Sequence, residues 1–172
     1  MIFGTEAFEI QILKSIHSFF ECGFMDFIMP FFSALGNGGM LWIAIAVILI
    51  FTKKYRRCGF LILVCMLLGL LIGNLTLKPL IARPRPSWTD TGFPLLISNP
   101  TDFSHPSGHT LSSFIAAFVM LKTDKRLGIP AIITACIIAF SRLYLFVHFP
   151  TDILAGILLA WLITLPFVRK AL

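Results

Sequence analysis

The stretch CGFLILVCMLLGLLIGNLTLKPLIARPRP, from Cys58 to Pro86, decides the fold class of this chain. Residues 58–77 are almost wholly apolar and supply the roughly 20 residues that a helix needs to cross the hydrocarbon core of a bilayer. Lys78, Arg83 and Arg85 follow directly. The stretch therefore predicts a membrane-spanning helix that ends in a cluster of cations.

The composition of the whole chain agrees with this prediction. Of its 172 residues, 58% are hydrophobic and 13% are charged. A soluble domain of this length carries about twice that charged fraction. We therefore predict a single integral membrane domain over residues 1–172, with the lipid bilayer as its surroundings. The net charge of +6 does not indicate a nucleic-acid partner, because the basic residues fall in short clusters between apolar runs.

Six apolar runs predict an all-α bundle of six transmembrane helices with a short outer-face loop region. A preceding amphipathic segment, residues 5–20, is expected to lie in the membrane interface or to extend the first span. The runs cover residues 24–36, 39–52, 58–77, 107–121, 128–147 and 151–168.

The basic clusters predict the orientation. With six spans, the clusters at residues 53–57, 122–126 and 169–170 fall on one side, which should be cytoplasmic. Both termini are then cytoplasmic in a multi-pass protein of the plasma membrane. Residues 78–106 and the turn at 147–151 lie outside, so three polar stretches meet at the extracytoplasmic face. Ionisable residues at membrane segments mark a working site by default.

The stretch HPSGH, residues 105–109, predicts an anion site at the start of a helix. Pro106 suits a first helical turn because its missing N–H would have no partner there. The free N–H groups of that turn and the positive end of the helix dipole favour an anion. Gly108 lets an oxygen approach the backbone, Ser107 adds a hydroxyl donor, and His109 adds an imidazole.

The stretch SRLYLFVHFPTD, residues 141–152, predicts a nucleophile. Asp152 lies four residues after His148 and can accept a hydrogen bond from its Nδ1–H, which leaves Nε2 with a free lone pair. Arg142, six residues before His148, can bind two phosphate oxygens at once. With Lys78 and Arg85 it can neutralise a pentacoordinate phosphoryl group, while His109 protonates the leaving oxygen and later activates water. We therefore expect neither a metal nor any other cofactor.

Other polar residues have simpler interpretations. Arg83 is either an interfacial anchor or a further phosphate contact. His17 and His105 are expected to be hydrogen-bonded interfacial residues, and Asp90 and Asp102 to be solvated loop charges.

The three stretches resemble the motifs of the type 2 phosphatidic acid phosphatase (PAP2) superfamily. The motif K-x6-R-P is matched by Lys78, Arg85 and Pro86, P-S-G-H by residues 106–109, and S-R-x5-H-x3-D by Ser141, Arg142, His148 and Asp152. The resemblance implies a phosphohistidine intermediate on His148, oriented by Asp152, with His109 as acid and base. It assigns phosphate binding to Lys78, Arg85, Ser107, Gly108 and Arg142.

We therefore expect a metal-independent lipid phosphatase or diphosphatase whose substrate is a membrane lipid phosphate, with undecaprenyl diphosphate or phosphatidylglycerophosphate favoured. The alternative is an anion-binding transporter, or a lipid-phosphate binding protein without hydrolysis. A transporter would need polar residues near the midplane, where the apolar runs carry only apolar residues and small ones such as Gly69, Gly156 and Thr164. The oligomeric state is left open.

Overall fold

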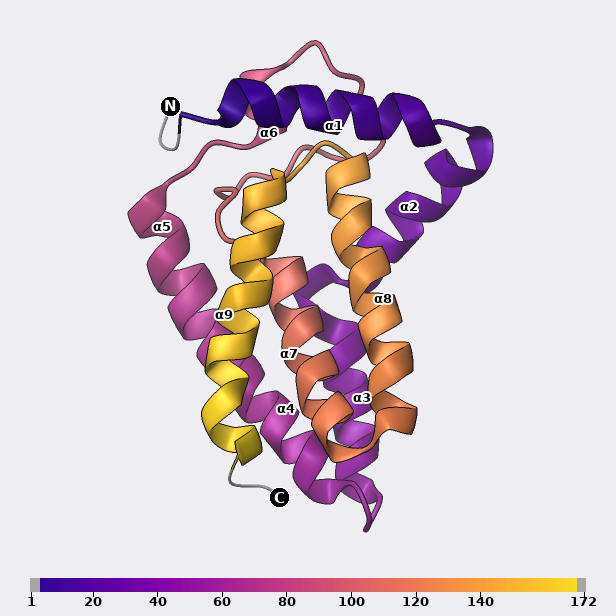
Figure 1. The fold of residues 1–172 in the computed structure, drawn as a ribbon, viewed down its shortest axis with the longest axis vertical. Coiled ribbons are helices and arrows are strands. Elements are labelled where there is room, and N and C mark those ends of the chain that lie inside the picture. The colour runs from indigo at the N-terminus through magenta and orange to yellow at the C-terminus, as the bar shows by residue number, and fades with distance from the viewer. Residues whose placement is uncertain (1–3, 170–172) are drawn as a thin grey trace.

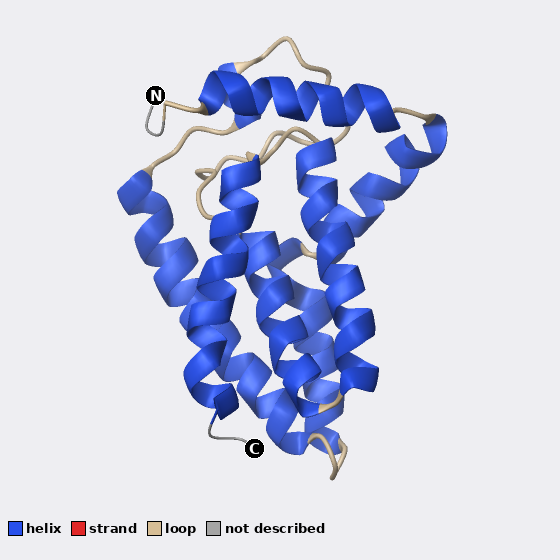
Figure 2. Ribbon diagram, in the orientation of Figure 1, coloured by secondary structure: helices blue, strands red, loops and turns tan. Residues whose placement is uncertain are grey.

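The computed structural model describes residues 4–169, which form a helical bundle without strands in this part of the chain (Figure 1, Figure 2). The predicted all-α class is confirmed. In chain order the elements are α1 (Glu6–Phe20), α2 (Gly23–Leu35), η1 (Asn37–Gly39), α3 (Met40–Phe51), α4 (Arg56–Gly69), the π-helix η2 (Leu70–Leu77), α5 (Lys78–Ile81), α6 (Pro86–Thr89), α7 (Gly108–Thr123), α8 (Lys125–Tyr144) and α9 (Pro150–Arg169).

The predicted count of six spans is not confirmed. Three helical segments are long and apolar enough to cross a membrane, namely 56–89, 125–144 and 150–167. A fourth arises if α2 and η1–α3, which meet at 47°, form one bent span. One cause is at η1, where Gly38 (φ 59°) and Gly39 (φ 69°) adopt the left-handed conformation that breaks a helix. A second is that α7 has only 16 residues, fewer than a helix needs to cross the bilayer. The two apolar runs that were expected to be separate spans are therefore joined by a 47° bend.

Helix α1 and the end of α9 lie at opposite ends of the bundle (Figure 1). In Figure 1, α1 lies across the end of the bundle where α6 is found, whereas α9 ends at the opposite end. The expectation that both termini share one side is thus not confirmed either. Helix α1 buries Glu6, Glu9 and Leu13 against the bundle and exposes Phe8 and Phe19.

Helix α7 is the centre of the bundle and packs against α4, α8 and α9. Ile115, Ala116 and Ala117 are fully buried there. Small side chains let helices approach closely, and such packing rather than water exclusion holds helices together in lipid. The indole of Trp42 in α3 donates a hydrogen bond of 2.9 Å to Ser113 Oγ, which fixes α3 against α7.

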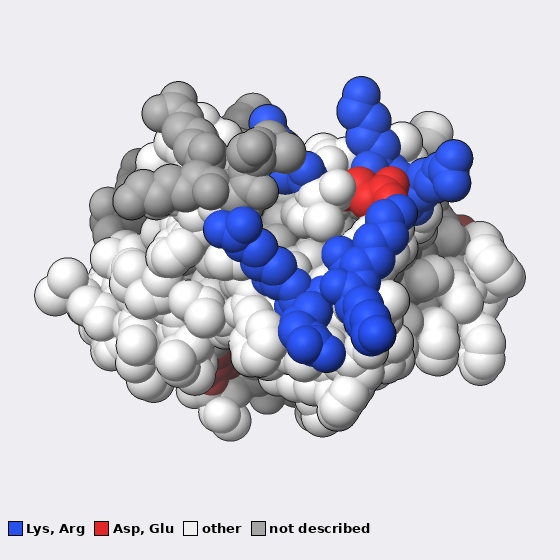
Figure 3. Space-filling model, turned by 90° about the horizontal axis from the view of Figure 1, so that it is seen from below, with Lys and Arg blue, Asp and Glu red and all other residues white. Residues whose placement is uncertain are grey.

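The end of the bundle remote from α1 is basic. Figure 3 views that end and shows lysine and arginine side chains gathered over it. Tyr55, in the loop between α3 and α4, donates a 2.7 Å hydrogen bond to Asp124 between α7 and α8, so the two basic loops lie together. The exposed cations of these loops and the adjoining helix ends are Lys53, Lys54, Arg56, Arg57, Lys122, Lys125 and Arg126.

The opposite end collects the three polar stretches. The starts of α7 and α9 and the ends of η2–α5 and α8 all lie there, beneath α1 (Figure 1). The connecting loop is pinned by Phe93, whose ring stacks on Phe146 with 4.1 Å between centroids. The fold thus brings segments far apart in sequence to one end of the bundle.

Candidate active site

One cavity of about 820 Å³ gathers most of the predicted site residues. It extends from the cations of the α5 region, past the start of α7, to an apolar part between α3 and α4. Of the eight predicted site residues, six line it, namely Lys78, Arg85, Gly108, His109, Arg142 and His148. Ser107 and Asp152 are not among the lining residues and lie behind them.

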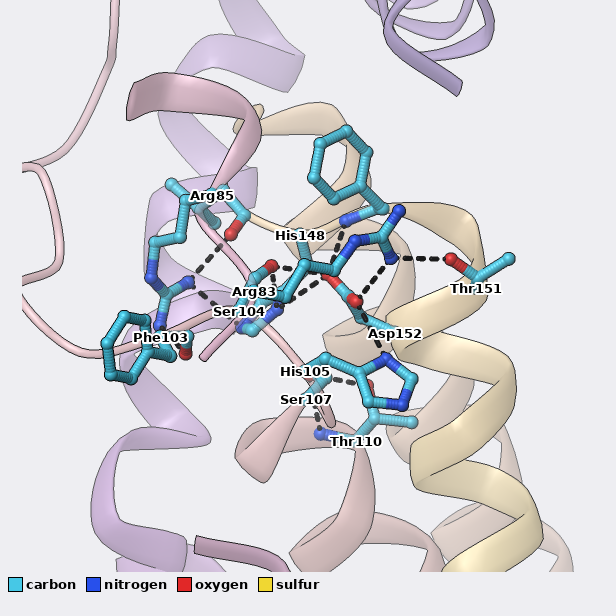
Figure 4. A network of polar contacts seen from close by, with 12 residues as sticks. Arg83, Arg85, Phe103, Ser104, His105, Ser107, Thr110, His148, Thr151 and Asp152 are labelled. Carbon is cyan, nitrogen blue, oxygen red and sulfur yellow. Dashed lines mark hydrogen bonds and ion pairs between the residues drawn. The ribbon is translucent and has the colours of Figure 1, made fainter. Parts of the chain in front are cut away.

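The carboxylate of Asp152 is bonded from several elements of the site (Figure 4). It is fully buried in the first turn of α9 and accepts a 2.8 Å hydrogen bond from the backbone N–H of Phe149. Ser104 donates to the same carboxylate oxygen. The other oxygen lies 2.7 Å from Arg83 Nη1 and 3.0 Å from His105 Nδ1. These contacts fix the carboxylate from several elements at once.

The carboxylate of Asp152 also faces His148, as the four-residue spacing predicted. The distance from His148 Nδ1 to Asp152 Oδ2 is 3.5 Å, long for a hydrogen bond. Ser104 Oγ lies 3.4 Å from the same nitrogen and close to the carboxylate, so the serine helps to connect them. Arg85 Nη1 lies 3.1 Å from His148 Nε2. An arginine can only donate, so Nε2 carries the lone pair and Nδ1 the proton.

The environment keeps this imidazole neutral. Burial, followed by the positive charge of Arg85, lowers the pKa of His148 from 6.5 to about 3, although Asp152 acts in the opposite direction. A neutral imidazole at neutral pH is the form that can attack phosphorus.

Three buried cations face the cavity. Lys78 and Arg85 both contact the carboxylate of Asp102, which was expected to be a solvated loop charge. Asp102 does lie in a loop with its side chain 56% exposed, as expected, but its carboxylate is also paired with both cations. Arg142 is 3% exposed, donates to Ser33 in α2, and has an Nε without a hydrogen-bond partner in the structure. The cations therefore provide the positive charge that a phosphoryl group requires.

His109 is held by a residue that the sequence reasoning did not single out. Its Nε2 lies 2.9 Å from Asn37 Oδ1 in η1. The broken helix thus positions the second imidazole of the cavity. A Cβ added to Gly36 would lie 2.6 Å from the His109 ring, so the backbone of α2 packs directly against it.

The start of α7 is built partly as predicted. Ser107 is the N-cap, and its Oγ accepts hydrogen bonds from the Thr110 N–H (3.4 Å) and hydroxyl (3.0 Å). Its hydroxyl oxygen therefore caps the helix, and Ser107 is not among the residues that line the cavity. Gly108 does line the cavity, where a Cβ would lie 3.0 Å from Asn74 Oδ1.

Arg83 has a role that neither of its expected interpretations covered. It is fully buried, stacks over the ring of Phe149 at 4.0 Å, and joins Asp152 to Glu9 of α1 at 2.9 Å. Glu9 in turn accepts from the backbone and hydroxyl of Thr151 at 3.1 and 2.7 Å. The carboxylate of Glu9 in the amphipathic N-terminal helix was the only sequence signal for this contact.

Known proteins resemble the chain over most of its length. The model of the PAP2 superfamily matches residues 59–171. An undecaprenyl-diphosphatase of Sulfolobus acidocaldarius is 31% identical over 157 residues, which cover 90% of this chain and 75% of that protein. Undecaprenyl-diphosphatase BcrC of Bacillus subtilis is 28% identical over 160 residues, covering 92% and 82%.

Solved structures agree with the fold. The transmembrane PAP2-type phosphatidylglycerolphosphate phosphatase of Bacillus subtilis superposes with a TM-score of 0.76 at 26% identity, over 98% of this chain and 88% of that one. LpxE of Aquifex aeolicus gives 0.74 at 24% identity over 93% of each chain, a likeness of fold alone. Since the family model matches well over half of the 172 residues, the chain belongs to the PAP2 superfamily, as its three motifs predicted, and is a membrane-embedded hydrolase.

Proposed function

We propose that this protein is a lipid phosphatase or diphosphatase that works through a phosphohistidine on His148. The observation that carries the proposal is the single cavity in which two imidazoles and three buried cations meet an apolar extension. The polar part suits a phosphoryl group, and the apolar part suits the first portion of a lipid chain. The apolar lining includes Ile43, Leu63, Met66, Leu67, Leu70 and Ile115.

The chemistry proceeds in two half-reactions. In the first, His148 Nε2 attacks phosphorus, the bond to the leaving oxygen breaks, and His109 protonates that oxygen. Lys78, Arg85 and Arg142 neutralise the charge that builds on the other oxygens. In the second, His109 takes a proton from water, the resulting hydroxide attacks phosphorus, and the P–N bond breaks to free His148.

Asp152 and Ser107 support these steps from behind the cavity. Asp152, with Ser104, holds the proton of His148 on Nδ1, so that Nε2 carries the lone pair. Ser107 fixes the first turn of α7, which presents the Gly108 backbone to the phosphate. Both residues therefore act by positioning others.

Undecaprenyl diphosphate and phosphatidylglycerophosphate are the substrates we favour. Two relatives named as undecaprenyl-diphosphatases are similar over 90% and 92% of this chain, and the Bacillus subtilis phosphatidylglycerolphosphate phosphatase shares its fold. Both lipids combine a compact anionic head with a long apolar tail, which matches a cavity with one cationic and one apolar part.

The site is proposed to face the extracytoplasmic side. The opposite end of the bundle carries the exposed lysines and arginines of the α3–α4 and α7–α8 loops (Figure 3). Such residues are retained on the cytoplasmic side of membrane proteins. In this arrangement α1 lies at the outer surface, above the site.

The test is phosphate release from purified protein with undecaprenyl diphosphate, phosphatidylglycerophosphate and water-soluble short-chain analogues. Acid quenching with labelled substrate should trap a protein-bound phosphate. We expect His148→Ala to abolish trapping and to lower turnover at least about a thousandfold. His17→Ala is the matched control, because His17 contacts the Tyr144 carbonyl at 3.2 Å and does not line the cavity.

Two outcomes would contradict the proposal. Trapped phosphate that persists in His148→Ala would assign the nucleophile to another residue. Tight binding of every lipid phosphate without release of phosphate would instead favour a binding protein or transporter.

A further inference from the structure

Asp102 lies in the cationic part of the cavity but has no role in the proposed reaction. Its two carboxylate oxygens are divided between two cations. Oδ2 lies 2.5 Å from Lys78 Nζ and Oδ1 lies 2.7 Å from Arg85 Nη2. Asp102 itself lines the cavity together with His109 and His148. A loop carboxylate thus neutralises two of the three cations assigned to phosphate.

The guanidinium of Arg85 has its donors engaged by the protein. Its Nε donates to the Asp102 carbonyl at 2.7 Å, and Nη1 to the Val147 carbonyl at 2.6 Å. Nη2 donates to the Asp102 carboxylate, with the Phe103 carbonyl at 3.4 Å. The planar fork of an arginine binds carboxylate and phosphate with the same geometry. A phosphate that binds Arg85 through Nη2 must therefore replace the carboxylate.

Exposure identifies which partner can move. The side chain of Asp102 is 56% exposed, whereas those of Lys78 and Arg85 are 8% and 2% exposed. The side chain of Asp102 can rotate so that its carboxylate is hydrated by water, whereas the buried side chains of Lys78 and Arg85 cannot leave the cavity. Exchange of carboxylate for phosphate keeps both cations paired, which avoids the large penalty of an unpaired buried charge.

The carboxylate is also ionised whenever phosphate competes with it. Partial burial acts to raise the pKa of Asp102, but the hydrogen bond from Lys78 and the charge of Arg85 hold it well below its usual range. Protonation therefore does not remove this competitor near neutral pH.

We propose that Asp102 is an internal counter-anion, which occupies the phosphate subsite of the empty enzyme and is displaced by the phosphate of the substrate. The inference rests on the proposed function, since it assumes that Lys78 and Arg85 bind the substrate's phosphate. Asp102 then sets the affinity for phosphate, and its return to the cations completes the release of the phosphate product. It is a residue that tunes affinity and does not touch the reacting atoms.

The proposal predicts a gain of affinity on removing the charge. In Asp102→Asn, the inhibition constant of inorganic phosphate and the KM of the substrate should both fall roughly three- to tenfold, without a rise in kcat. Asp102→Glu, which keeps the charge, should restore most of the wild-type inhibition constant. Asp90→Asn is the matched control, because Asp90 lies in the same loop region and pairs with Lys14 on the surface. It makes the same change in net charge and should leave both constants unchanged.

Direct binding separates this inference from the proposed function. Titration of purified protein in detergent with inorganic phosphate, followed by calorimetry, measures the subsite without any turnover. Tighter binding by Asp102→Asn than by wild type supports the inference even if no lipid phosphate is hydrolysed, in which case only the proposed function fails. Unchanged binding would overturn it. Weaker binding would overturn it as well and would show that Asp102 holds the cations in place for phosphate.

Discussion

Arg83 Nη1 lies 2.7 Å from Asp152 Oδ1, and both side chains are fully buried at the junction between α1 and the start of α9. The contact joins the carboxylate behind His148 to Glu9 of α1, because the other Nη of the same guanidinium lies 2.9 Å from Glu9. The helix across the end of the bundle is thereby tied to the candidate active site. Arg83 is thus a positioning residue beside the motif arginine, Arg85.

Arg83→Gln should destabilise the protein by about 3 kcal/mol, because removal of one partner of a buried ion pair leaves the other charge uncompensated. Thermal unfolding in detergent measures this loss, and Arg83→Lys should recover part of it. Lys14→Gln removes a salt bridge whose lysine side chain is 53% exposed, and should leave the melting temperature unchanged. Equal melting temperatures for Arg83→Gln and wild type would contradict a structural role for this pair.

Gly36→Ala should lower kcat roughly 10- to 100-fold, because the new Cβ would lie 2.6 Å from the His109 ring and 3.0 Å from Ile138. The imidazole must move, whereas the phosphate-binding cations are untouched, so KM should change little. Gly23→Ala, at the first residue of α2, whose C-cap is Gly36, has open space around its added Cβ and serves as the control. Steady-state kinetics on both variants decide the matter, and wild-type kcat in Gly36→Ala would exclude His109 from the rate-limiting chemistry.

Arg142→Lys should lower kcat/KM roughly a hundredfold, the magnitude found when a donor to a transition-state oxygen is removed. A lysine keeps the charge but lacks the planar fork, and it loses the Nε–H, which has no hydrogen-bond partner among residues 4–169. Arg126→Lys, an exposed arginine on the remote basic end, is the matched control. If Arg142→Lys retained full activity, charge alone would suffice at this position.

His148 should show no titration between about pH 5 and 8. Burial and the charge of Arg85 lower its pKa from 6.5 to about 3, so the folded protein disfavours the protonated ring. The contribution of neutral His148 to the free energy of unfolding is fully present above pH 6.5. It is lost as the pH falls towards 3, because the unfolded chain binds the proton first. Nitrogen NMR of labelled histidines, assigned with His148→Gln, measures the midpoint. A midpoint near 6.5 for His148 would contradict the buried, neutral imidazole.

The sequence predicted those parts of the site that local spacing determines. His148 comes two residues before α9 and Asp152 lies in its first turn, whereas Gly108 and His109 begin α7. Proline and short-range spacing fix such relations within a few residues. Membrane class followed in the same way from the length and apolarity of single segments. The limits of the first spans could not be predicted from the sequence. The left-handed conformations of Gly38 and Gly39, which bend the chain between α2 and α3, give no periodic signal.

The rest of the site was decided by the tertiary structure. Arg83 meets Glu9 and Asp152 across 74 and 69 residues of sequence, and His109 meets Asn37 across 72. Asp102, in an irregular loop, had no periodicity to place it against Lys78 and Arg85. The sequence by itself determined a helical membrane protein with a phosphate-binding residue set, since these properties follow from composition and short-range spacing. Only the packed bundle decided which charges face each other. These pairs join residues far apart in sequence, and a buried charge needs a partner of opposite sign because water does not reach it.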